Sequence, residues 1–102
     1  MLVHVTAVHS ENNCPGYHHD TLPGMMEALE RREDLARQYN IRLHYMVSAA
    51  PEHSFYALLE TENFPSISRF LVELLPVPHD YKITLVQSAD DLVSNWKPVA
   101  QA

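Results

Sequence analysis

The order in which two hydrophobic periodicities alternate along the chain constrains its fold most strongly. Apolar residues recur at every second position in four segments, which is the pattern of half-buried strands. In two longer segments they recur at spacings of three and four, which is the pattern of amphipathic helices. Strands are predicted at residues 1–9, 41–48, 54–61 and 81–88, and helices at about 22–39 and 63–75. The tail is expected to add one helical turn at 90–96 and to fray over 97–102.

Strand, helix, strand, strand, helix, strand is the order of the ferredoxin-like arrangement, in which two helices cover one face of a four-stranded antiparallel sheet. Right-handed crossovers place the third strand beside the first, so the predicted spatial order is 4-1-3-2. A chain of 102 residues can bury about two-thirds of its unfolded surface and needs no disulfide or metal to fold. We therefore predict a single α+β domain that spans residues 1–102.

This topology resembles that of small ferredoxin-like domains that pair their open sheet faces as dimeric α+β barrels. That superfamily includes cofactor-free monooxygenases, isomerases, haem-degrading enzymes and uncharacterised proteins. The resemblance rests on the order of elements over most of the chain and on no sequence motif. It implies a homodimer formed through the sheet, whereas function must be inferred from particular residues because one fold supports many activities.

Charge and hydropathy exclude two classes of partner. Thirteen acidic and seven basic residues give a net charge of -6, and Arg31-Arg32 is the only basic pair, so nucleic acid and anionic membranes are not expected partners. The N-terminus lacks the basic segment of a signal peptide, and no apolar run approaches the ~18 residues needed to span a bilayer. A cytoplasmic protein is therefore expected.

The loop between the first strand and the first helix concentrates reactive side chains. It contains the only cysteine, Cys14, and three of the seven histidines, His9, His18 and His19. A single cysteine excludes an internal disulfide, so Cys14 is a buried small residue, a metal ligand or a reactive thiol. Loops held by a rigid scaffold often carry function, so we regard this loop as the candidate site.

Topology brings other histidines to the same edge of the sheet. In the 4-1-3-2 order the end of strand one, with His9, lies between the starts of strands three and four, which follow His53 and His79. Strand alternation places all three histidines on the helix-facing side, over which the loop carrying Cys14 must cross. A thiolate and imidazoles suit zinc or copper, and suit iron less well. We predict a metal site formed by His9, Cys14 and His53, with His79 as the fourth ligand and Met46, His18 or a water as its substitutes.

Two other interpretations of these residues stay open. In the first, His9 and His53 cap strand ends and bond loop carbonyls, while Cys14 is buried against the first helix. In the second, Cys14 is an active thiol, because it lies just before a helix N-terminus, where the helix dipole and the neighbouring His9 could stabilise the thiolate.

The opposite sheet face offers a second functional hypothesis. Its mixture of apolar and polar residues is too apolar to leave in water, so we predict that it packs against a second copy of the chain. The apolar residues expected there include Leu2, Val8, Met46 and Leu58. If the resulting barrel keeps a cavity, an enzyme of the cofactor-free monooxygenase or isomerase type could act there on a small organic molecule. Its catalytic residues would be His4, His44, Tyr56 and Arg42.

Overall fold

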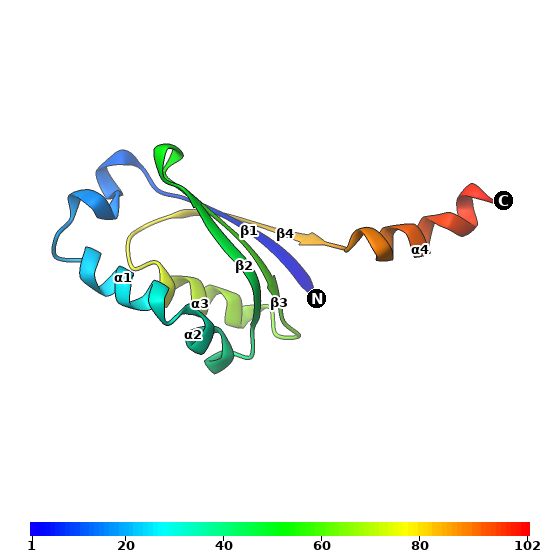
Figure 1. The fold of residues 1–102 in the computed structure, drawn as a ribbon, viewed down its shortest axis with the longest axis horizontal. Helices are drawn as coiled ribbons and strands as arrows, with labels where there is room; N and C mark the ends of the chain where they lie inside the picture. The colour runs from blue at the N-terminus through cyan, green and yellow to red at the C-terminus, as the bar shows by residue number, and fades with distance from the viewer.

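The computed structural model describes residues 1–102 and contains the predicted order of strands and helices (Figure 1). The strands are β1 (Leu2–Val8), β2 (Arg42–Ala49), β3 (Ser54–Glu60) and β4 (Asp80–Val86). The α-helices are α1 (Leu22–Glu30), α2 (Arg32–Gln38), α3 (Pro65–Leu74) and α4 (Ala89–Ala100). Three short 3-10 helices are η1 (Glu11–Asn13), η2 (Pro15–Tyr17) and η3 (Ala50–Glu52).

The sheet confirms the predicted topology. Its strand order is β2-β3-β1-β4, which is the predicted 4-1-3-2 order written from the other edge, and every neighbouring pair is antiparallel. Helices α1, α2 and α3 lie on one face of this sheet (Figure 1). The fold is therefore α+β and ferredoxin-like, with β1 in the interior of the sheet.

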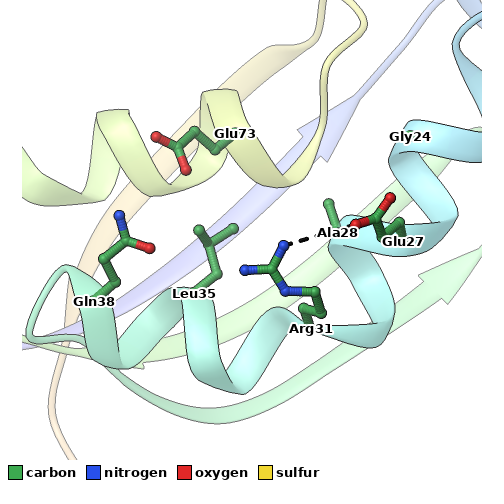
Figure 2. Close-up of a pocket in the computed structure, with 7 residues that line it drawn as sticks. All are labelled: Gly24, Glu27, Ala28, Arg31, Leu35, Gln38 and Glu73. Atoms are coloured by element: carbon green, nitrogen blue, oxygen red, sulfur yellow. Dashed lines mark ion pairs between the residues drawn. The ribbon is translucent and has the colours of Figure 1, made fainter.

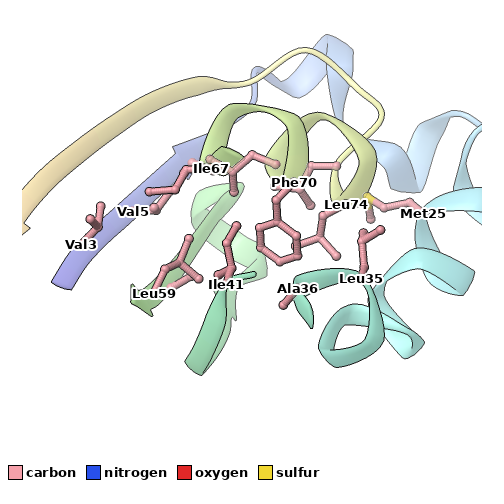
Figure 3. Close-up of a cluster of buried hydrophobic side chains, with 14 residues drawn as sticks. Val3, Val5, Met25, Leu35, Ala36, Ile41, Leu59, Ile67, Phe70 and Leu74 are labelled. Carbon is pink, nitrogen blue, oxygen red and sulfur yellow. The ribbon is translucent and has the colours of Figure 1, made fainter. Parts of the chain in front are cut away.

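The core lies between this sheet face and the three helices (Figure 3). Val3 and Val5 of β1 are buried and alternate with half-buried neighbours, as a strand with one face in the core requires. Ile67 and Phe70 of α3 are completely buried against them because they recur on one face of an amphipathic helix. Burial of these side chains supplies the main driving force for folding, and it involves none of the predicted metal ligands.

The predicted helix at 22–39 is broken in two at Arg31. This residue leaves helical geometry at φ -96° and ψ 14°, and α2 starts directly after it. The stretch around the break is charged and exposed, so no core contact holds a straight helix there. Leu35 and Ala36 of α2 are buried in the core (Figure 3). Asn40, which follows the end of α2, is in the left-handed conformation with a φ of 56°, a conformation that asparagine adopts at helix ends.

A β-bulge at His44 corrects the predicted faces of β2. Leu43 pairs with Leu59 but Tyr45 pairs with Leu58, so His44 is the additional residue. Beyond the bulge every side chain is on the face opposite to the one that uninterrupted alternation predicts. Met46, expected on the open face, packs against the core instead. Tyr45 and Val47 take its place on the open face.

The C-terminal tail forms a complete helix, α4, where one turn and a frayed end were expected. The Ser88 hydroxyl caps it by accepting a hydrogen bond from the Asp91 N–H at 3.0 Å. The helix projects away from the sheet (Figure 1), and none of its residues is buried. This arm explains the long dimension of 59 Å and a radius of gyration of 16.1 Å, against about 13 Å for a compact chain of this length.

Candidate metal centre

The pairing of β1 with both of its neighbours places His9 between His53 and His79. Val8 pairs with Ser54 of β3 and with Asp80 of β4. His9, the residue after β1, therefore lies opposite His53 and His79, which precede these two strands. The His9 N–H donates to the His53 carbonyl at 3.1 Å and extends the ladder by one residue. The ring of His9 lies 5.2 Å from that of His53 and 4.8 Å from that of His79, centroid to centroid. Three histidines distant in sequence therefore form one cluster.

Cys14 joins this cluster from the loop, where it lies between η1 and η2. Its N–H donates to the Glu11 carbonyl at 3.2 Å, and its carbonyl accepts from the Tyr17 N–H at 3.0 Å. These bonds hold the backbone on both sides of a half-buried thiol. One potential ligand atom from each of His9, Cys14 and His53 lies within 4.8 Å of the others. This group could hold a metal ion.

His53 is held in a backbone conformation that L-residues seldom adopt. It ends η3 in the left-handed region, at φ 54° and ψ 40°, and its N–H donates to the Ala50 carbonyl at 3.0 Å. The left-handed conformation costs about 1–2 kcal/mol in a residue with a Cβ, although histidine is among the residues that enter it more often. Backbone conformations of this kind cluster at functional sites, so this one supports a functional role for His53.

This backbone conformation predicts the stability order of two variants. His53→Gly and His53→Ala both remove the imidazole, but only glycine relieves the positive φ. The glycine variant is therefore expected to be more stable than the alanine variant by about 1 kcal/mol in urea unfolding of the metal-free protein. An alanine variant that equals or exceeds the glycine variant would show that the hairpin relaxes out of the left-handed conformation at no cost.

A directional set of hydrogen bonds links the histidine rings. Nδ1 of His53 lies 3.3 Å from Nε2 of His9, and Nδ1 of His9 lies 3.0 Å from Nε2 of His79. Nδ1 of His79 lies 2.8 Å from the Val77 carbonyl oxygen. The rings of His9 and His53 therefore bond other imidazoles, where the capping interpretation expected loop carbonyls. Nothing in the sequence pattern identifies the Val77 carbonyl as the end of this chain.

The surroundings of His9 favour its neutral form. Burial lowers the pKa of His9 below the ordinary value of 6.5, and the neighbouring His79 and His53 lower this pKa further. Phe55 and Tyr81 lie beside the cluster, with ring centroids 6.2 Å from His9 and 5.9 Å from His79 respectively. Burial also favours the neutral form of the Tyr81 phenol, and for this acid it does so by raising the pKa. A neutral imidazole is the form that binds a metal ion.

The position of Cys14 removes one of the two supports of the active-thiol interpretation. The helix that follows it directly is η2, a single 3-10 turn, and α1 begins only at Leu22. The dipole of a full helix, on which that interpretation relied, is thus not adjacent to the thiol. His18, one of the substitutes for the fourth ligand, directs its Nε2 at the Asn12 carbonyl within the same loop.

The residues of the enzyme hypothesis lie on the open sheet face, away from this cluster. The ring of His4 is 6.4 Å from that of Tyr56, and Nε2 of His44 is 2.8 Å from Oε1 of Glu60. The hydrogen bond from His44, with smaller contributions from the charges of His44 and Arg42, lowers the pKa of Glu60. Sequence reasoning did not assign a role to Glu60, although strand alternation already places it on the same sheet face as His44.

A separate groove of about 330 Å³ lies between α1, α2 and α3 (Figure 2). Its wall includes Leu35, Glu73 and an ion pair between Arg31 and Glu27 at 3.8 Å. None of the predicted site residues lines it. The groove is a charged surface depression and contributes nothing to the metal cluster.

Comparison with known proteins leaves the chemistry to be argued from this chain. No protein-family model and no curated protein matches the sequence. The crystal structure of an uncharacterised NIPSNAP domain protein from Burkholderia xenovorans is similar, with 14% sequence identity and a TM-score of 0.45. The match covers 87% of this chain and 96% of that chain. No helix of the structure has the length and apolar character needed to cross a membrane.

Proposed function

We propose that the protein binds one transition-metal ion, copper or zinc, through His9, Cys14 and His53. The observation that carries this proposal is the approach of one thiol and two imidazoles, from three separate segments, to within 4.8 Å of one another. Thiolate and imidazole are the ligands preferred by zinc and by copper, whereas magnesium and calcium require oxygen ligands. Iron suits this ligand set less well than copper or zinc.

The spacing of the two imidazoles fits shared coordination. Two zinc–nitrogen bonds of 2.0–2.1 Å at a tetrahedral angle separate their nitrogens by about 3.3 Å. His9 Nε2 and His53 Nδ1 are 3.3 Å apart. The thiolate of Cys14 must lie about 3.6 Å from each nitrogen in such a site, whereas the ligand atoms of this group lie within 4.8 Å of one another, so the loop has to close by roughly 1 Å. The two 3-10 turns around Cys14 give the loop a local means of making that adjustment.

Three protein ligands leave one coordination position for another molecule. A closed shell of four protein ligands would favour a structural or storage role, whereas an open position suits a substrate, dioxygen or the tuning of electron transfer. Two side chains considered for that position already bond elsewhere: His18 to the Asn12 carbonyl and His79 to His9 and Val77. These contacts support an open site.

Elemental analysis of protein purified without a histidine tag tests the proposal. After dialysis against a weak chelator, about one equivalent of copper or zinc per chain should remain, and apoprotein should recover one equivalent on addition of the metal. Binding of a divalent ion displaces the thiol proton of Cys14, so about one proton should be released per ion bound. Metal contents well below one equivalent after such loading would contradict the proposal.

We further propose that the open sheet face packs against a second copy of the chain. Tyr45 and Val47, which the bulge turns to this face, are 42% and 53% exposed, and Val8 and Val86 at the strand ends are also exposed. The arm α4 adds a second exposed apolar stripe that includes Trp96. A symmetric dimer can cover such a surface in both copies with the same contacts.

The dimer predicts a specific response to a charge on the open face. Val47→Lys should shift the sedimentation coefficient from that of a dimer to that of a monomer, because two lysines related by symmetry would be buried together. Val72→Lys is the matched control, since Val72 is exposed on α3, on the other side of the sheet. A wild-type protein that sediments as a monomer at all concentrations would contradict the dimer.

An enzyme of the cofactor-free monooxygenase or isomerase type is the second candidate function. It is favoured by the His44–Glu60 pair, because a carboxylate that orients an imidazole is a common arrangement for acid–base catalysis. His4, Tyr56 and Arg42 would supply further acid, base and anion-binding groups if a dimer encloses them. Saturable binding of a small organic acid that is lost in His44→Gln but retained in Cys14→Ser would favour this function.

A further inference from the structure

The Val77 carbonyl fixes the direction of the hydrogen bonds in the histidine cluster. A carbonyl oxygen only accepts, so Nδ1 of His79, 2.8 Å away, must carry a hydrogen. A neutral imidazole carries one ring hydrogen, so Nε2 of the same ring is an acceptor. Nδ1 of His9, 3.0 Å from that atom, must therefore donate to it.

The tautomer of His9 follows from this direction. With its hydrogen on Nδ1, neutral His9 has a lone pair on Nε2, the atom that faces His53. In the metal-free protein Nδ1–H of His53 donates to this lone pair. An ion between the rings would be held by Nε2 of His9 and Nδ1 of His53, with the hydrogen of neutral His53 on its Nε2.

We propose that His79 is a positioning residue that holds His9 in the tautomer with a free Nε2, and is not a fourth metal ligand. Both ring nitrogens of His79 already have partners, in Val77 and His9. Metal-binding histidines commonly donate their second ring N–H to a carbonyl or carboxylate, which sets the ring orientation. Here an imidazole fixed by a backbone carbonyl fulfils that role. The inference rests on the proposed metal site, and it replaces the sequence-based prediction of His79 as a ligand.

Packing around His79 restricts its ring as a positioning role requires. The rings of Phe55 and Tyr81 lie 5.9 Å from it on centroids, and that of His9 lies 4.8 Å away at an interplanar angle of 83°. The start of β4 fixes the backbone next to it, because Asp80 pairs with Val8. Because the ring has little freedom, its hydrogen bond to the Val77 carbonyl also fixes the position of Nε2, the atom that accepts from His9 Nδ1.

Two substitutions at this position separate positioning from coordination. His79→Gln keeps an amide oxygen that can accept from His9 Nδ1–H, whereas His79→Phe keeps an aromatic ring and removes the acceptor. His19→Phe is the control, because His19 is an exposed residue of the loop. We expect zinc and copper affinities within about threefold of wild type for the glutamine and control variants, and a loss of about 10–100-fold for His79→Phe.

Nitrogen-15 NMR of the metal-free proteins reads the tautomer without any metal. His9 should carry its ring proton on Nδ1 in wild type and in His79→Gln. In His79→Phe it should become a mixture of the two neutral tautomers. That result supports the inference even if wild type binds no metal, in which case only the proposed function fails. A wild-type His9 that carries its ring proton on Nε2 would overturn the inference. So would equal losses of metal affinity in both His79 variants, with one fewer imidazole bound than in wild type, since these would identify His79 as a ligand.

Discussion

Replacing Cys14 with serine is expected to weaken copper or zinc binding by more than about 100-fold while the fold stays intact. Loss of a hydrogen bond to a metal ligand typically lowers metal affinity by about 10–100-fold, and loss of the only thiolate among three ligands should exceed that range. A serine hydroxyl is a poor ligand for soft or borderline metals at neutral pH. Competition with a chromophoric chelator measures the affinity, and circular dichroism measures the fold.

Two variants on histidines define this prediction further. His53→Ala should lower affinity by a similar factor, because His53 is one of the three ligand-bearing residues. His18→Ala should change affinity by several-fold at most, since its ring bonds the Asn12 carbonyl and does not belong to that group. Equal losses from the two changes would place the ligands in the loop alone, and would contradict the geometry proposed for the site.

Metal affinity is expected to fall by at least about 100-fold between pH 7.5 and pH 5, because protons compete with the ion for a thiolate and two imidazoles. His9 should resist protonation longer than a free imidazole, since its folded-state pKa is below 6.5. The folding stability that neutral His9 contributes is complete above its unfolded-state pKa of 6.5. It is lost as pH falls through the lower pKa of the folded state. Because each ligand takes up its proton at a different pH, metal affinity should decline steadily between pH 7.5 and pH 5.

The domain should remain folded after the metal dissociates. Its buried core, which includes Ile67 and Phe70, contains none of the three proposed ligands. Metal content and amide hydrogen exchange measured on the same samples between pH 7.5 and 5 test this separation. Residues 10–20 should exchange faster once the ion is released, while β1 and β3 stay protected. Loss of protection throughout the sheet together with the metal would show that the ion is part of the fold.

The topology could be predicted from the sequence because alternation at every second residue indicates a strand, whereas spacings of three and four indicate a helix. The approach of His9 to His53 and His79 followed from that topology, since three strand ends must meet at one edge in the order 4-1-3-2. Cys14 could be placed near them because its loop starts at the same edge. These predictions depended on strand order and direction, and small errors in element ends do not alter either.

Local departures from regular geometry could not be predicted in the same way. A bulge at His44 adds one residue to β2, and hydrophobic alternation carries no record of it, so Met46 was assigned to the wrong face. The break at Arg31 lies in a charged, exposed stretch, while the apolar spacing continues past it, so the pattern carries no signal of it. The His9 tautomer depends on a carbonyl, at Val77, that every residue type possesses.

X-ray absorption at the metal edge of the loaded wild-type protein tests the central proposal most directly. For zinc, the account predicts one sulfur at about 2.3 Å and two imidazole nitrogens at 2.0–2.1 Å, with one further light atom from water or another small molecule. Cys14→Ser should lose the sulfur contribution. A shell that contains only nitrogen and oxygen in the wild-type protein would contradict a metal centre built on His9, Cys14 and His53.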